Sequence, residues 1–317
     1  MPEIAYGAGE GQGGRIVLAS DGTESGDIAL VADKPRMPPI IQPWGLLLLL
    51  SADWRIDAVS TNAEAILGLR ADDLLGRPVA SVLGPAAIHA LRNRFALLGG
   101  SGGPERLCNQ QLTEGGRQLD LLLHLAGSRP LVEAFPAADP EGIDVAAMTG
   151  RMAAWIEGSE SIVSLGDRSA HSVRGVTGCD SVCVWKARAG QPPELIASYA
   201  RPGFSPAPAF AAPSSAVRFI ADCHSQPCPL LVREGTAAPD LAASMLGVES
   251  AGFRDYVCAG GASSGLLVPL IVSDRPWGWI IGLNRGERQL GLARLSVIEL
   301  FARLMSAEIR RLEALSS

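Results

Sequence analysis

Five consecutive leucines, at residues 46–50, are the feature that most limits what this chain can fold into. Gly45 precedes the run, and Ser51, Ala52 and Asp53 follow it, so turn-forming and polar residues bound the leucines on both sides. A membrane span needs about 20 apolar residues. A run of five between turn signals is instead typical of a fully buried strand. We therefore predict a buried strand at residues 46–50.

The pattern after this strand resembles a PAS domain. An alternating strand (RIDAV) follows the leucines, then helical spacing begins near Asn62, and two further alternating runs come later, RLCNQQLT and RQLDLLLHL. Gly115 and Gly116 separate these last two runs. Glycine tolerates the positive φ that a tight hairpin requires, so the runs are predicted to pair. We assign residues 39–136 to a PAS domain and residues 1–38, which end in a proline-rich stretch, to an extended N-terminal arm.

A second domain is predicted for the rest of the chain. The chain has 317 residues, and single hydrophobic cores stop growing at about 250–300 residues. Residues 137–145 have the composition of a linker. Residues 146–176 then show helical spacing and lead into short strands separated by Gly, Pro and Ala, which resembles an α+β GAF domain over residues 146–317.

The last helix of this domain, predicted at residues 292–315, carries a candidate dimer seam. Apolar side chains recur along it at alternating three- and four-residue spacing, with one charged interruption, which is typical of a helix-helix seam. The positions are Ile298, Phe301, Met305, Glu308, Leu312 and Leu315. We predict a homodimer through this helix. The alternative left open is that the same face packs only on its own domain.

Charge and motif content exclude several classes of function. The net charge is −6 and no long Lys/Arg cluster occurs, so nucleic acid is not expected as a direct partner. The first residues lack the basic and apolar regions of a secretory signal, and we expect a cytoplasmic protein without membrane association. No G-x-S-x-G, P-loop or H-E-x-x-H pattern is present, so an enzyme is not expected.

Three segments resemble motifs of the chromophore-binding core of bacteriophytochromes. They are residues 41–45 (IQPWG), 215–230 (SAVRFIADCHSQPCPL) and 252–256 (GFRDY). The resemblance covers about residues 35–313. It implies an α+β chain in which a PAS domain precedes a GAF domain, with antiparallel sheets flanked by helices. It also implies a figure-of-eight knot, in which the N-terminal segment threads a GAF lasso between about Arg218 and Gly247.

Positions that would hold a bilin in that family carry other residues here. The family attaches the pigment through a cysteine of the N-terminal arm, whereas the first cysteine of this chain is Cys108. Only a thiolate can form that thioether. Gly203 and Phe253 align with the groups that accept the pyrrole N–H hydrogen bonds, and Leu283 aligns with the histidine that faces the D ring. Burying charged pyrrole nitrogens without acceptors would cost several kcal/mol.

The groups that bind the propionates are also reduced. Arg218 remains, while Gly247 replaces a second arginine, and Gly265 and Leu267 replace serines. Tyr256 is retained. Both retained residues have structural alternatives, because a tyrosine beside a glycine-rich turn can be a packing residue and an arginine on a strand can cover a sheet edge or pair with an acid.

The six cysteines are expected as thiols in a reducing compartment. Cys258 is the thiol nearest to Phe253, and it is the one candidate for covalent attachment of a bilin. Cys223 and Cys228, in the segment DCHSQPC, form a candidate redox pair. Together with His224 they have an unusual spacing for zinc and no evident fourth ligand, so no metal is predicted.

These observations predict a phytochrome-like sensory and signal-transduction module that has lost covalent bilin binding and photoconversion, and no cofactor is predicted. Noncovalent binding of biliverdin or another linear tetrapyrrole stays open. Two alternatives are a light-independent redox or small-molecule sensor with a remodelled GAF pocket, and an interaction domain whose cavity is filled by the side chains of Phe253, Leu267, Leu283 and Trp279. The sequence does not identify the signal or the signalling partner. It also does not tell whether the natural chain continues into PHY or output domains.

Overall fold

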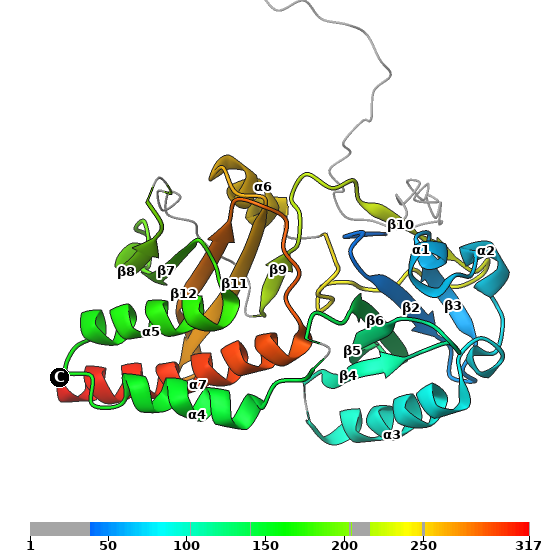
Figure 1. The fold of residues 1–317 in the computed structure, drawn as a ribbon, viewed down its shortest axis with the longest axis horizontal. Helices are drawn as coiled ribbons and strands as arrows, with labels where there is room; N and C mark the ends of the chain where they lie inside the picture. Colours follow the sequence, from blue (N-terminus) through cyan, green and yellow to red (C-terminus); the bar gives the residue numbers. More distant parts are fainter. Residues whose placement is uncertain are drawn as a thin grey trace, which may run out of the picture. The chain divides into compact units, whose positions relative to one another are not determined.

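A computed structural model describes residues 39–101, 103–139, 141–202, 204, 216–248 and 251–316. The predicted arm, residues 1–38, lies outside the described residues. Residues from Pro38 onwards form one compact unit, which contains two lobes, each built on its own antiparallel sheet (Figure 1). Among the described residues, no helix combines the length and the apolar character that a bilayer crossing requires.

The first lobe is built on a seven-stranded sheet. Its strands lie in the order β1, β10, β3, β2, β6, β5, β4, and every neighbouring pair is antiparallel. Their bounds are β1 (Ile40–Ile41), β2 (Leu46–Leu50), β3 (Ile56–Ser60), β4 (Glu105–Gln111), β5 (Gln118–Ala126), β6 (Arg129–Pro136) and β10 (Cys228–Val232). The predicted hairpin is the β4–β5 pair, with Gly115 at φ +69° in its turn.

The leucine run is buried on both faces of this sheet, as predicted. Side chains alternate along a strand, so Leu46, Leu48 and Leu50 pack into one core and Leu47 and Leu49 into another. The first core is closed by α1 (Ala63–Leu67), α2 (Ala71–Leu74), the short 3-10 helix at Val79–Ser81 and α3 (Pro85–Ser101). The second core continues into the other lobe. Because neither face of β2 meets water, the strand needs no polar residues.

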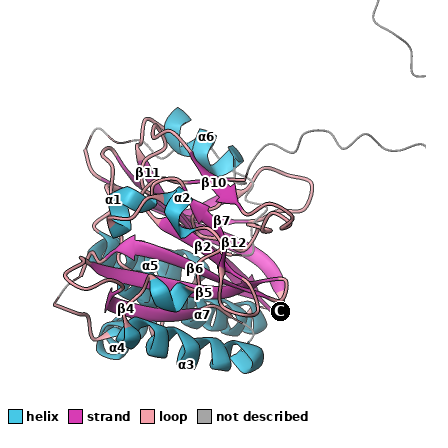
Figure 2. Ribbon diagram, turned by 90° about the vertical axis from the view of Figure 1, so that its right-hand side faces the viewer, coloured by secondary structure: helices cyan, strands magenta, loops and turns pink. Residues whose placement is uncertain are grey.

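The second lobe is built on a five-stranded sheet in the order β8, β7, β12, β11, β9. These strands are β7 (Ser181–Lys186), β8 (Glu194–Ala200), β9 (Arg218–Ile220), β11 (Ser264–Val272) and β12 (Arg275–Asn284). One face carries α4 (Val145–Ile156), α5 (Ile162–Thr177) and α7 (Leu292–Leu315). The other face carries α6 (Ala251–Ala259), and the strands lie between these two layers (Figure 2).

A segment of the second lobe crosses into the sheet of the first. β10 lies far along the chain, yet it pairs with β3 and with β1. Next to it, the amide of Gln42 donates to the carbonyl of Leu246, and the Gln42 side chain donates to the carbonyl of Phe219 over 2.9 Å. The N-terminal segment is therefore held on both sides by residues of the predicted lasso. The knot itself depends on the course of residues 1–38, so it stays a prediction.

The terminal helix has the predicted bounds, and its predicted seam is mostly buried within the chain. Ile298, Phe301, Met305 and Leu312 pack in the core that α7 shares with α4, α5 and the sheet. Only Leu315 of the apolar seam positions is exposed. This face of α7 therefore packs on its own domain, which is the alternative left open above. The homodimer is not tested by this observation and stays a prediction.

Candidate functional site

The candidate site lies where α6 covers the outer face of the five-stranded sheet. Because side chains alternate along strands, every second residue of β7, β11 and β12 points toward α6. Phe253 and Val257 are four residues apart on one face of α6 and meet these side chains. The buried cluster consists of Cys183, Trp185, Phe204, Ile220, Cys223, Phe253, Val257, Ala262, Leu267, Trp279, Ile281 and Leu283.

The predicted pocket positions that the structure describes on this face are in contact with one another. Phe253, Leu267 and Leu283 are all at least 98% buried. At Gly265, an added Cβ would lie 2.5 Å from Val257 Cγ2, 3.3 Å from Phe253 Cζ and 3.4 Å from Leu283 Cδ2. Carbon side chains thus occupy the space that a serine at this position would need. Gly203, the remaining position of this group, lies outside the described residues.

Two tryptophans supply polar atoms to this apolar cluster. Trp185 and Trp279 are directly opposite each other on β7 and β12, and each is 6% exposed. Neither indole N–H has a hydrogen-bond acceptor among the described residues. A buried donor left unpaired costs about 1–3 kcal/mol. Sequence reasoning assigned Trp279 only a filling role and did not single out Trp185.

Tyr256 lies at the edge of the same cluster, stacked on Phe253 with 6.2 Å between the ring centroids. Burial raises the pKa of its phenol well above the usual value. The structure therefore gives this retained tyrosine a packing contact with Phe253.

The two other predicted positions, Arg218 and Gly247, belong to the lasso. Arg218 on β9 donates from Nη1 to the carbonyl of Ser244 over 3.0 Å and from Nη2 to the carbonyl of Ala242. At Gly247, an added Cβ would lie 2.7 Å from the carbonyl oxygen of Leu241. The position has no room for an arginine side chain. Arg218 thus binds two carbonyls of the lasso.

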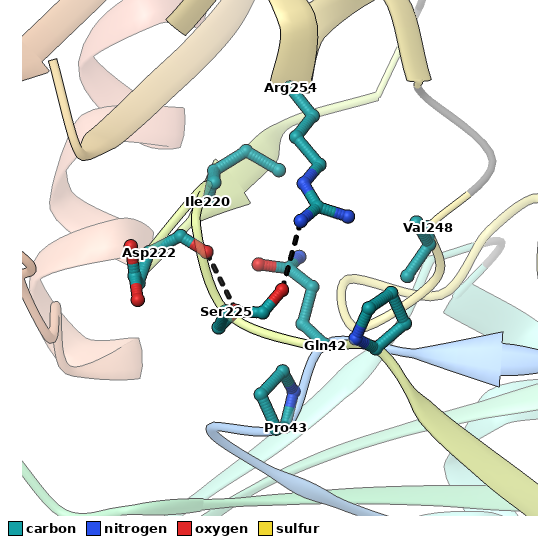
Figure 3. A pocket seen from close by; sticks show the side chains of 8 residues that line it. Gln42, Pro43, Ile220, Asp222, Ser225, Val248 and Arg254 are labelled. Carbon is teal, nitrogen blue, oxygen red and sulfur yellow. Dashed lines mark hydrogen bonds between the residues drawn. The ribbon is translucent and has the colours of Figure 1, made fainter. Parts of the chain in front are cut away.

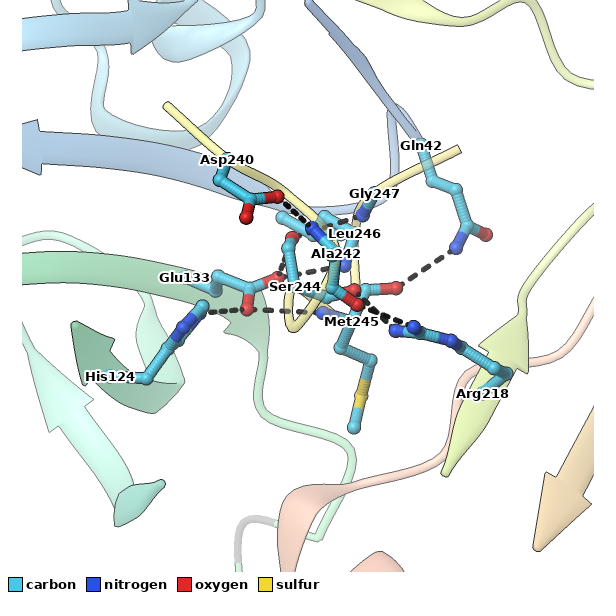
Figure 4. A network of polar contacts seen from close by, with 10 residues as sticks. All are labelled: Gln42, His124, Glu133, Arg218, Asp240, Ala242, Ser244, Met245, Leu246 and Gly247. Carbon is cyan, nitrogen blue, oxygen red and sulfur yellow. Dashed lines mark hydrogen bonds and ion pairs between the residues drawn. The ribbon is translucent and has the colours of Figure 1, made fainter. Parts of the chain in front are cut away.

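A buried carboxylate, which the sequence did not reveal as important, holds the lasso to the first lobe (Figure 4). Glu133 on β6 is fully buried. It accepts hydrogen bonds from the Ser244 hydroxyl at 2.9 Å, the Met245 amide at 3.1 Å and the Leu246 amide at 2.7 Å. His124 Nε2 lies 2.8 Å from Glu133 Oε1. The available signal was an acid inside the apolar strand RPLVEAFP, since unpaired buried carboxylates are rare.

The glutamine of the IQPWG segment joins residues near the two ends of the lasso. Gln42 Nε2 donates to the carbonyls of Phe219 and Met245 at 2.9 and 3.1 Å. Nearby, Arg254 reaches from α6 to the turn before β10, where its Nη2 donates to the carbonyl of Ser225 over 2.9 Å (Figure 3). A small surface pocket separates the Gln42 and Arg254 side chains. The motif therefore serves here as a scaffold for the lasso.

Two cysteine predictions need correction, namely that all six cysteines are thiols and that Cys223 pairs with Cys228. Cys223 is disulfide-bonded to Cys258, with 6.0 Å between their Cα atoms, so the predicted pairing of Cys223 with Cys228 is wrong. Cys228 belongs to β10 and is buried against the first lobe, with its Sγ 3.1 Å from Thr61 Oγ1. Strand pairing carries Cys228 away from Cys223 despite their closeness in sequence. Cys258, the candidate for bilin attachment, is engaged in the disulfide.

Solved structures of bacteriophytochrome chromophore-binding domains match both lobes of this chain together. The sequence model of the PAS fold family matches residues 32–136. The chromophore-binding domain of a Stigmatella aurantiaca bacteriophytochrome, a mutant in the Pr state, is 22% identical with a TM-score of 0.76, and the match covers 87% of this chain and 98% of that one. The chromophore-binding domain of the unusual bacteriophytochrome RpBphP3 from R. palustris is 25% identical with a TM-score of 0.73, covering 89% and 99%.

A longer structure of RpBphP3 shows how far the likeness extends. It is 27% identical to this chain with a TM-score of 0.75, and the match covers 88% of this chain but 60% of the longer one. The described chain thus corresponds to the chromophore-binding portion of these proteins.

Proposed function

We propose that this chain, a phytochrome-like PAS-GAF module, is a sensory and signal-transduction unit that neither attaches a bilin covalently nor photoconverts. One observation carries the proposal. Phe253, Leu267 and Leu283 fill the face of the GAF sheet beneath α6 together with Val257, and Gly265 leaves no space beside them. The structural neighbours are chromophore-binding domains, so the corresponding site is where loss of the pigment would be seen.

The residues at this site do not fit a linear tetrapyrrole. Phe253 offers carbon where the pyrrole nitrogens would need an acceptor, and Leu283 offers carbon at the position of the histidine that would face the D ring. Arg218, which would meet a propionate, is bound to two lasso carbonyls. No cysteine precedes Cys108 to form a thioether. A pigment that entered would have to displace close-packed side chains, which costs several kcal/mol.

Absorbance tests this proposal. The chain is produced with a biliverdin source, purified and scanned between the red and the far-red before and after illumination. We expect no visible band and no zinc-dependent fluorescence of the denatured chain, which would mark a covalent adduct. A green, light-reversible holoprotein would overturn the proposal. The chromophore-binding domain of the Stigmatella aurantiaca bacteriophytochrome, produced in the same way, shows whether the biliverdin supply is sufficient.

The signalling output in this proposal runs through α7, in the cytoplasm, without catalytic chemistry in the module itself. A homodimer is part of the proposal. The buried seam of α7 cannot serve it without unfolding of the lobe, so the outward positions Leu300 and Leu304, 44% and 40% exposed and one helical turn apart, are the proposed contact.

A second candidate function is a light-independent redox sensor, which the Cys223–Cys258 bond favours. The bond ties the turn after β9 to α6, and α6 covers the filled pocket. Forming it passes two electrons to an oxidant such as a peroxide and releases two protons. Intact mass before and after mild peroxide tests this, with Cys228→Ser as a control that should still oxidise. If Cys223→Ser loses the same mass as wild type on oxidation, this candidate fails.

A further inference from the structure

A third potential ligand stands beside the disulfide. Cys223 Sγ, Cys258 Sγ and a ring nitrogen of His224 all lie within 4.8 Å of one another. His224 Nδ1 is 3.9 Å from Cys258 Sγ. A disulfide sensor has no need of this imidazole. Two thiolates and an imidazole, however, are a ligand set that suits Zn²⁺.

The backbone holds these three side chains together independently of the S–S bond. The His224 amide donates to Asp222 Oδ1 over 3.0 Å, and this contact shapes the turn. Arg254, one helical turn before Cys258 on α6, donates from Nε to the carbonyl of Cys223 over 2.8 Å and from Nη2 to the carbonyl of Ser225 (Figure 3). Reduction of the disulfide would therefore leave the turn and the helix side by side. Such preorganisation is what a metal site requires.

We propose that the reduced chain binds one Zn²⁺ through Cys223, His224 and Cys258, with water in the fourth position. Sequence alone could not reach this set, because it offered Cys228 as the second thiol, and β10 carries that residue into the other lobe. His224 is exposed and Cys258 is partly exposed, so the metal would have a path from solvent. The proposal is independent of whether the module holds a bilin.

Metal binding and the disulfide exclude each other. With Zn–S bonds of about 2.3 Å, tetrahedral geometry separates two thiolate sulfurs by about 3.8 Å, whereas a disulfide joins them at about 2.05 Å. Oxidation by a peroxide would take two electrons from the two thiolates and form the S–S bond. When the oxidant is hydrogen peroxide, its O–O bond breaks and, with two protons from solvent, gives two waters, while Zn²⁺ is released. Oxidation of the two thiols would thus release the metal ion from the end of α6.

Cobalt titration of the full chain tests the proposal, because Co²⁺ bound by thiolates gives a charge-transfer band and intense visible bands. We expect the phosphine-reduced chain to bind a single equivalent of Co²⁺, which Zn²⁺ displaces, and the peroxide-oxidised chain to bind none. His224→Ala should weaken binding by about tenfold or more yet still form the disulfide on oxidation. Cys228→Ser, the matched control, should behave like wild type in both assays.

Three outcomes would overturn the metal site: no charge-transfer band in the reduced wild-type chain, His224→Ala binding as tightly as wild type, or an equal loss in Cys228→Ser. Far-ultraviolet circular dichroism and a thiol count check that each variant is folded and reduced. The oxidised wild-type chain serves as a further control, because oxidation removes the two thiolate ligands without any substitution. The two proposals can fail independently. A failed cobalt titration would not affect the proposal that the chain binds no bilin, and a green holoprotein would not affect the proposed metal site.

Discussion

Glu133 on β6 accepts a 2.7 Å hydrogen bond from the backbone amide of Leu246 in the lasso. The two residues are 113 positions apart in sequence, and they belong to different lobes. Since Glu133 is fully buried and also accepts from Ser244 and Met245, one carboxylate fixes three consecutive lasso residues against the PAS sheet.

Removing this carboxylate should loosen the lasso. We expect Glu133→Ala to lower the free energy of unfolding by about 2–4 kcal/mol, because two buried amide donors and a hydroxyl lose their acceptor. Urea denaturation measures the change. Glu114→Ala, at the exposed turn of the β4–β5 hairpin, is the matched control and should shift stability by less than about 0.5 kcal/mol. Equal losses in the two variants would contradict the assignment.

Close packing around Gly265 predicts that a larger residue at this position lowers the stability of the chain. Adding one methyl group there brings Cβ to 2.5 Å from Val257 Cγ2, so Gly265→Ala should destabilise the chain by about 1–3 kcal/mol. Gly175, exposed on α5 with nothing within 4 Å of an added Cβ, is the control. Gly175→Ala should stabilise by about 0.5–1 kcal/mol, because alanine favours helix. Thermal unfolding of both variants checks the contrast, and a Gly265→Ala variant as stable as wild type would show that the cluster has spare room.

Glu313 on α7 should make stability depend on acid pH. Partial burial acts to raise its pKa, but hydrogen bonds from Trp277 Nε1 at 2.8 Å and Lys186 Nζ at 3.0 Å outweigh burial and hold the pKa below its usual 4.5. Since the unfolded chain binds this proton more readily, the contribution is fully present above pH 4.5 and is lost as pH falls through the folded-state pKa.

The measurement is urea unfolding of wild type and Glu313→Gln across acid pH. At neutral pH the variant should be less stable, and the difference should shrink below pH 4.5. Glu287→Gln, at an exposed position before α7, should show no such trend. A difference that stays constant with pH would mean that the Glu313 carboxylate is not what the contacts recognise.

The proposed homodimer can be tested on the outward side of α7. Placing charge in a helix interface is unfavourable, so Leu300→Glu with Leu304→Glu should convert the dimer to a monomer in light scattering coupled to size exclusion. Leu97→Glu changes an exposed leucine on α3, 53% exposed, and should leave the dimer intact. A wild-type chain that is already monomeric at micromolar concentration would remove this part of the proposal.

The candidate site was only partly predictable. Phe253, Leu267 and Leu283 were recognised as apolar replacements by resemblance, and their mutual packing follows from strand alternation and helix spacing. Arg218 was recognised as retained, but its acceptors lie more than 20 residues away in the lasso. No local pattern reports such a partner, because hydrogen bonds between distant segments depend on how the lobes pack.

The sequence by itself determined the elements: the buried strand at Leu46–Leu50, the β4–β5 hairpin and the bounds of α7. These depend on hydrophobic period, turn chemistry and length, which neighbouring residues encode. Only the tertiary structure decided that Cys223 meets Cys258 instead of Cys228, and that Glu133 holds the lasso. The reason is that β10 leaves its own lobe to join the PAS sheet, and strand pairing over such a separation is selected by the packing of the whole fold rather than by any segment of it.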